Sequence, residues 1–233
     1  KDVINYGAEI LSKYDLDGMW FINGGMINND KVFWLSQLMY LYDNNHLDKF
    51  LIEFNSEFPN LLKPIDLNNS SVKDVDVWAK DNYSKTLSKS LNDYISNLGW
   101  NEMIEANRNS IYANSNELKT LSENFVVGNH TSSHPNFRNL SIEDKVKESE
   151  ESRKILENII GKNINTFAFP FGQEHLHWCQ NDVSLLQNLG YDFIFSVANE
   201  FNRVNYDVIH RHEILEFDNN EFRGFMNNLI GDN

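Results

Sequence analysis

The chain has 233 residues, and 41% of them are hydrophobic, including sixteen Phe, nine Tyr and five Trp. This is enough apolar material for a large core, so global disorder is excluded. The net charge of −14 argues against a nucleic-acid partner, and no run approaches the roughly 18 apolar residues of a membrane span. The single cysteine, Cys179, excludes an internal disulfide and a multi-cysteine zinc site, and it tilts the expected localisation towards a reducing cytoplasm.

The first 30 residues predict a helix, a strand and a turn. Apolar residues at helical spacing indicate a helix up to about Lys13, and the apolar run 19–22 predicts a buried strand that ends at Gly24 and Gly25. The chain opens inside this helix, without Met and without a capping residue. We therefore expect the sequence to start within a longer protein.

Residues of about 31–121 have a different pattern. Two helical stripes, at 33–42 and 87–98, flank a polar loop at 68–71. We interpret the segment as a mostly helical insertion within one domain spanning 1–233. Its polar part, about 47–77, suggests a lid or rim over a binding site.

Strand and helix patterns alternate from Phe125 onward. The expected strands are 125–128, 166–169, 193–197 and 208–210, and the expected helices are 141–161, 183–190 and 221–230. Repeated strand–helix units imply a parallel sheet or barrel, with functional residues at the carboxyl ends of the strands.

Two histidines follow the expected strand 125–128. His130 and His134 are four residues apart, so a helical turn would bring both imidazoles to one metal ion. Imidazole nitrogen suits zinc, and also cobalt or nickel. Two ligands fall short of the three that a catalytic zinc ion usually takes from the protein. The pattern also fits a polar loop whose histidines contact water.

The strand at 166–169 ends in Pro170, Phe171 and Gly172. Proline makes this turn rigid, glycine would let a substrate approach the backbone, and the Phe171 amide would be free to donate to an oxyanion. An ordinary strand-ending turn explains the same residues.

Other histidines lie in the C-terminal half. On an expected strand, His210 and Arg211 alternate between faces, and His210 is a candidate general acid. An exposed edge strand gives the same alternation. His175 and His177, beside Trp178, fit either a pocket wall or, more simply, a solvated loop.

The histidine motif at 127–135, followed by Leu140-Ser141 and the turn at 167–172, resembles the polysaccharide deacetylases (the NodB-homology domain). Residues 189–196 and 10–22 are similar to further segments of that family, so the resemblance covers roughly residues 1–30 and 120–215. It implies an α/β fold, a distorted (β/α) barrel of parallel strands with surrounding helices. The implied reaction is metal-dependent hydrolysis of the N-acetyl or N-formyl group of an amino sugar in a polysaccharide or glycan precursor.

The resemblance also implies roles for individual residues. His130 and His134 would ligate a divalent metal, and the third ligand and the catalytic base would come from an Asp-Asp motif expected a few residues upstream of Lys1. The Phe171 amide would stabilise the oxyanion, and His210 would protonate the leaving amine.

The sugar groove would be lined by Pro170, Gly172 and Trp178. Ala168 stands where the family often has an Arg that orients the catalytic Asp. Arg211 is a candidate to replace it.

Two other functions fit the same residues. A deacetylase fold without the Asp pair would bind a glycan or a partner without turnover, and the residues upstream of Lys1 would show whether the pair exists. An amidohydrolase would act on a small non-sugar amide, and assays of N-acetylated oligosaccharides against small cyclic amides would separate it from a deacetylase.

Overall fold

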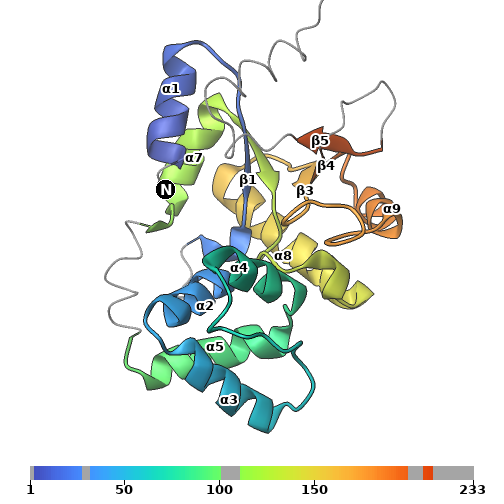
Figure 1. Ribbon diagram of the computed structural model, residues 1–233. Helices are drawn as coiled ribbons and strands as arrows, with labels where there is room; N and C mark the ends of the chain where they lie inside the picture. Colours follow the sequence, from blue (N-terminus) through green and yellow to red (C-terminus); the bar gives the residue numbers. More distant parts are fainter. Residues whose placement is uncertain (1–2, 28–31, 101–110, 199–206, 212–233) are drawn as a thin grey trace, which may run out of the picture.

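A computed structural model of the chain describes residues 3–27, 32–100, 111–198 and 207–211 (Figure 1). The helix expected at 221–230 and residue His212 lie outside these ranges. None of the described helices is long and apolar enough to span a membrane.

Five parallel strands form one sheet. They are β1 (Met19–Ile22), β2 (Val126–Asn129), β3 (Thr166–Ala168), β4 (Phe193–Val197) and β5 (Ile209–Arg211). Strands that are neighbours in the sheet are also consecutive in the chain, and each pairing is parallel. This is the strand order around a (β/α) barrel, whereas a doubly wound sheet reverses direction from an inner strand. The predicted α/β fold of parallel strands with surrounding helices is confirmed.

Gly128 in β2 lies close to side chains from both neighbouring strands. A Cβ atom at Gly128 would lie 2.6 Å from the Phe21 ring and from Oγ1 of Thr166. Glycine is therefore required in β2, because no larger residue fits between its neighbours.

Helices pack around the sheet (Figure 1). A π-helical turn (Val3–Gly7) leads into α1 (Ala8–Lys13), and the later helices are α7 (Ser115–Asn124), α8 (Ile142–Ile160) and α9 (Gln180–Asn188), with short 3-10 turns at Gly24–Met26 and Phe137–Asn139. Helix α8 begins at Ser141, whose hydroxyl accepts the N–H of Asp144, and ends at Gly161 with a left-handed φ of 69°. Both boundaries agree with the sequence pattern.

The segment between β1 and β2 forms a separate group of helices, α2 (Trp34–Asp43), α3 (Leu47–Glu57), α4 (Val72–Asp81) and α5 (Lys85–Asn97). They pack around their own hydrophobic cluster, which includes Leu38, Leu41, Phe50, Val75, Leu87 and Leu91. In Figure 1 these helices lie beyond the carboxyl end of β1. The partly buried Leu140 and Phe171 pack against this cluster and so join it to the edge of the sheet.

Candidate active site

His130 and His134 meet at the carboxyl end of β2. Their Nε2 atoms are 3.1 Å apart, and the two rings make an angle of 74°. The segment between them is a loop rather than a helical turn, because Thr131 and His134 have left-handed backbones with φ of 69° and 56°. The two rings therefore meet through two unfavourable backbone conformations that the rest of the fold has to hold in place.

The hydrogen bonds assign the proton on His130. Its Nδ1 lies 2.7 Å from the carbonyl oxygen of Ala168, and a carbonyl can only accept, so Nδ1 carries the hydrogen and Nε2 presents a lone pair. Burial, together with the Arg211 guanidinium, lowers the pKa of His130 to about 4, although the hydrogen bond to Ala168 opposes this shift. Burial and the neighbouring His130 also hold the pKa of His134 well below its usual value. Both rings are thus in the neutral form that binds metal ions.

This pair fits two ligands of a zinc ion. Two nitrogens bound at about 2.0–2.1 Å to a tetrahedral zinc ion lie about 3.3 Å apart, and the observed separation is 3.1 Å. The bond from His130 to a backbone carbonyl is the contact that usually orients a ligating imidazole. Within the described ranges, Nδ1 of His134 is buried without a hydrogen-bond partner, and no group of three or more His, Cys, Asp or Glu side chains could hold a metal ion. A metal ion held by this histidine pair would need its third protein ligand from outside the described residues.

Glu148, on helix α8, anchors the histidine loop. Its carboxylate accepts hydrogen bonds from the backbone N–H groups of Ser132 (3.0 Å) and Ser133 (2.8 Å) and from the Ser133 hydroxyl (2.8 Å). Only 9% of the residue is exposed, so its charge is compensated by these donors rather than by water. Sequence reasoning missed this residue. The available signal was an acidic residue on the face of α8 that is buried.

Asn129, the last residue of β2, is a second anchor that sequence reasoning missed. It is fully buried, and its Oδ1 accepts the N–H of Thr131 at 3.0 Å. Its amide group donates to the backbone oxygen of Ser149 and to the Tyr191 hydroxyl. Asn129 therefore fixes where the strand stops and where the loop departs.

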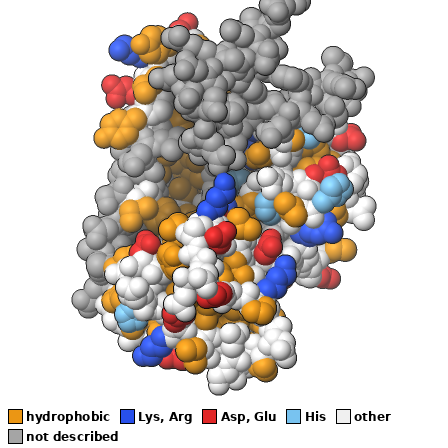
Figure 2. Space-filling view, viewed as in Figure 1, with side chains coloured by type: hydrophobic (Ala, Val, Ile, Leu, Met, Phe, Trp, Pro, Cys, Tyr) orange, Lys and Arg blue, Asp and Glu red, His pale blue; other side chains and the backbone are white. Residues whose placement is uncertain are grey.

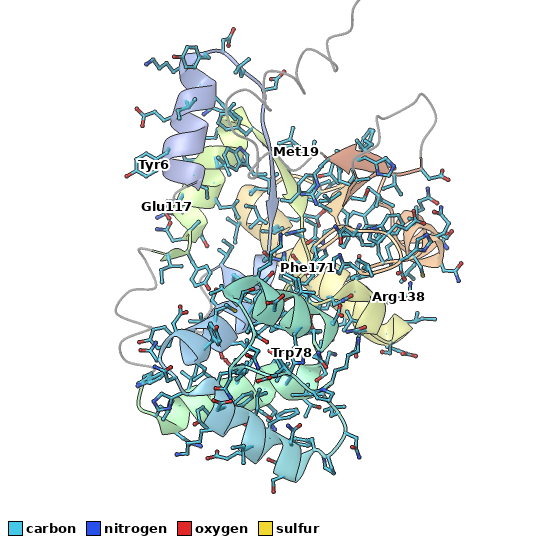
Figure 3. The ribbon with its side chains drawn as sticks, in the orientation of Figure 1. Tyr6, Met19, Trp78, Glu117, Arg138 and Phe171 are labelled. Carbon is cyan, nitrogen blue, oxygen red and sulfur yellow. The ribbon has the colours of Figure 1, made fainter. Side chains whose placement is uncertain are left out.

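The turn after β3 carries Phe171, which is labelled in Figure 3, and brings its ring to His134. Phe171 has a φ of 59°, and no acceptor for its N–H lies within the described residues. Its ring packs edge-on against the His134 ring, with the centroids 4.6 Å apart. Pro170 and Gly172 are buried, and a Cβ at Gly172 would meet Val197 at 2.7 Å. Gly172 thus allows close packing against β4, and Phe171 is the member of this turn that faces the site.

A cavity of about 1320 Å³ lies between the helical insertion and the carboxyl edge of the sheet. One wall is helix α4, and the other includes His134, Phe171, His177 and Arg211. Charges of both signs line it, with Lys73, Lys80 and Arg211 beside Asp76, Asp81 and Glu174. Figure 2 shows acidic and basic side chains interspersed on the face of the molecule over α4. The insertion is therefore part of the candidate site.

The two neighbouring residues of β5 have different surroundings. Arg211 lines the cavity, its Nε donates to the Ser196 carbonyl, and its guanidinium lies 5.3 Å from the centre of the Phe21 ring. Nδ1 of His210 lies 2.7 Å from the Ser196 hydroxyl, and His210 is absent from the described lining of the cavity. The structure thus brings Arg211 closer than His210 to the wall that holds His134.

The loop before α9 separates three residues that stand together in the sequence. Trp178 is 1% exposed, stacks on Phe169 and donates to the Gly172 carbonyl, so it packs in the core. His177 is buried and lines the cavity, whereas 81% of the His175 side chain is exposed. The expectation of a solvated loop holds for His175 and fails for His177.

Comparisons with known proteins show which family the chain resembles. The polysaccharide deacetylase family model matches residues 80–194, which include the histidine loop, Glu148 and the turn after β3. The match covers just under half of the chain, and the resemblance to the polysaccharide deacetylases noted from the sequence motifs is confirmed. A search of the curated proteins gives no match.

Solved structures of deacetylases resemble the chain at low sequence identity. A de-N-acetylase from Aggregatibacter actinomycetemcomitans has a TM-score of 0.53 at 12% identity, covering 96% of this chain and 70% of that chain. The deacetylase PplD of Streptococcus pyogenes has a TM-score of 0.43 at 12% identity, covering 84% of this chain and 51% of that chain. A polysaccharide deacetylase from Bacillus cereus has a TM-score of 0.42 at 22% identity, covering 49% of this chain and 36% of that chain. The Aggregatibacter actinomycetemcomitans structure shows that the fold is shared. The chain spans about half the length of the Streptococcus pyogenes protein.

Proposed function

We propose that the protein hydrolyses the N-acetyl or N-formyl group of an amino sugar in a polysaccharide or glycan precursor, with zinc, or alternatively cobalt or nickel, as its metal. The observation that carries this proposal is the 3.1 Å separation of the Nε2 atoms of His130 and His134 beside the cavity. The match of residues 80–194 to the polysaccharide deacetylase family model supports the reaction class. The cavity volume of about 1320 Å³ exceeds the roughly 300–1,000 Å³ of ordinary small-molecule pockets and favours an extended glycan over a small cyclic amide.

The residues of the chain have distinct tasks in this proposal. His130 and His134 would hold the metal as neutral imidazoles, and the third ligand and the base would come from the Asp pair that the family resemblance implies outside the described residues. When bound, a divalent cation polarises the amide carbonyl and lowers the pKa of water. The N–H of Phe171 donates to the oxyanion of the tetrahedral intermediate, a contact worth about 3 kcal/mol in comparable sites.

The two residues of β5 complete the proposed site. His210 protonates the leaving amine, and the Ser196 hydroxyl, 2.7 Å from its Nδ1, orients the ring. Arg211 puts a permanent positive charge on the cavity wall, where it stabilises negative charge that develops during hydrolysis.

The test is the substitution His134→Ala, with His175→Ala as the control on an exposed histidine. Bound divalent metal is measured by elemental analysis after dialysis, and acetate release is measured on N-acetylated oligosaccharides. We expect His134→Ala to lose both metal and activity and the control to keep both, with circular dichroism showing that each variant is folded.

Three results would contradict the proposal in different ways. Unchanged metal stoichiometry in His134→Ala would refute the metal site. A wild-type protein that binds metal and glycan without releasing acetate or formate would be a binding protein. Turnover of small cyclic amides alone would indicate an amidohydrolase of another specificity.

A further inference from the structure

The loop between β3 and α9 places the imidazole of His177 on the cavity wall, and its hydrogen bonds show which ring nitrogen carries the hydrogen. The backbone N–H of Gln173 donates to Nδ1 of His177 at 3.1 Å. A backbone N–H can only donate, so Nδ1 is the acceptor, and the hydrogen of the neutral ring is on Nε2. No acceptor for this Nε2–H lies within the described residues. The loop thus leaves one hydrogen-bond donor available at the cavity.

This donor is held in a fixed position. The N–H of His177 donates to the Gln173 carbonyl at 2.9 Å, and the His177 carbonyl accepts from the N–H of Arg138 at 2.8 Å. The residue is 8% exposed, and its ring lies 5.3 Å from the Phe171 ring, centroid to centroid. A donor held in this way loses little conformational entropy when a ligand binds.

The position of His177 relates it to the histidine pair. The Phe171 ring contacts His177 on one side and His134 on another, with centroids 5.3 Å and 4.6 Å away. Lys80 of α4 lies over the same ring, with Nζ 5.1 Å from its centroid, and pairs with Asp76 at 2.5 Å. A ligand whose amide reaches His134 therefore also passes His177.

The charge state of His177 excludes a role as proton donor in catalysis. Burial, with the nearby Lys80 ammonium, lowers its pKa to about 4, although Asp81 opposes this shift. The ring is therefore neutral near pH 7, and a neutral imidazole binds oxygen acceptors without giving up its proton. This distinguishes His177 from a general acid, which has to be protonated at the working pH.

We propose that His177 determines specificity by donating its Nε2–H to a hydroxyl oxygen of the sugar beside the amide that is hydrolysed. This inference rests on the proposed function and adds to it a residue that recognises the sugar, on the loop before α9. A site built to hydrogen-bond a hydroxyl rejects an analogue without it, because its donor then stays unpaired.

The experiment compares His177→Asn, His177→Gln and His175→Asn. The Asn side chain can still accept the Gln173 N–H but has no donor where Nε2 was, whereas the Gln amide can reach that position. We expect His177→Asn to raise KM for N-acetylated oligosaccharides about tenfold, the effect of losing one hydrogen bond worth about 1.4 kcal/mol. Its kcat and metal content should stay at wild-type values, His177→Gln should recover part of the loss, and His175→Asn should match the wild type.

Two outcomes would overturn the inference. A wild-type KM in His177→Asn shows that the donor is unused, and a fall in thermal stability with no separate change in KM shows a purely structural role. If the wild type releases no acetate, the proposed function fails by itself. The dissociation constants of the same oligosaccharides, measured by calorimetry on the same variants, then decide the role of His177. Tenfold weaker binding by His177→Asn supports it, and equal binding or none refutes it.

Discussion

At the end of β2, two side chains that contact no substrate in our proposal determine how the chain turns. Asn129 accepts the N–H of Thr131, and Glu148 accepts the N–H groups of the next two residues. These bonds compensate for the left-handed conformation of Thr131, which would otherwise cost about 1–3 kcal/mol. Both are positioning residues for the histidine pair.

We therefore expect Glu148→Gln to weaken metal binding. The amide keeps the size of the side chain but replaces one acceptor oxygen by a donor, so at least one loop bond is lost. Loss of such an orienting contact lowers metal affinity by about 10–100-fold, which a competition titration with a zinc chelator measures. Glu151→Gln, on the same helix with 53% of its side chain exposed, should have no effect. Equal affinities in the two variants would contradict the positioning role.

The spacing of His130 and His134 suggested that their rings could meet, but it did not show how. A four-residue spacing indicates a helical turn, and the structure has a loop with two left-handed residues in its place. The stabilising carboxylate is fourteen residues beyond His134, on a helix whose sequence reads as an ordinary amphipathic pattern. An acidic residue on the buried face of the helix is the one local signal, and it does not show which loop the carboxylate contacts, because that depends on packing.

The strands were the most predictable elements. The apolar runs at 19–22 and 193–197 have the bounds of β1 and β4, and β2 and β5 are displaced by one residue from the expected positions. Short strands of this kind stand out because most of their residues are apolar and turn residues bound them. The need for glycine at position 172 was less visible in the sequence, because the residue that leaves no room for a Cβ atom there, Val197, lies in the next strand.

The turn after β3 permits a test of that need. Gly172→Ala should lower the free energy of unfolding by about 2–4 kcal/mol, because the new Cβ adds overpacking against Val197 to the cost of a left-handed backbone. Gly161→Ala is the control, since Gly161 has a φ of 69° and a Cβ added there would meet no described atom within 4 Å. Gly161→Ala should lower the free energy of unfolding by only about 1 kcal/mol. Urea denaturation measures both, and equal losses would show that the contact with Val197 is unimportant.

At the scale of the whole molecule, two hydrophobic cores meet at the cavity. One belongs to helices α2–α5 and the other lies around β3, β4 and α9, and Phe171 packs against the first from the loop that follows β3. The sequence motifs concern only the second. The contribution of α4 to the cavity could not be read from them, because its partners across the cavity, from His134 to Arg211, are about 50–140 residues away in the chain.

Helix α4 should therefore influence the length of glycan that is accepted. Val77 is 52% exposed and lines the cavity, so Val77→Trp should narrow it and raise KM for tetra- and hexasaccharides several-fold, with little change for a disaccharide. Ile52→Trp places the same ring on α3 at a residue that is 72% exposed and outside the described cavity lining, and it should behave as wild type. Steady-state kinetics on a series of oligosaccharides provides the measurement. An equal change in KM for oligosaccharides of every length would contradict the role of α4 as a wall of the cavity.

The pairing of β1 with β2 has a consequence for the history of such a chain. Because β1 and β2 are parallel, the chain that leaves β1 at Ile22 has to return to the opposite end of the sheet, where Val126 pairs with Met19. Helix α7 precedes β2 and completes this crossover, and helices α2–α5 come before α7 in the chain. A helical cassette inserted between β1 and α7 can be exchanged, shortened or enlarged during evolution while the strand register stays fixed. New walls for the same imidazole pair are then accessible by recombination.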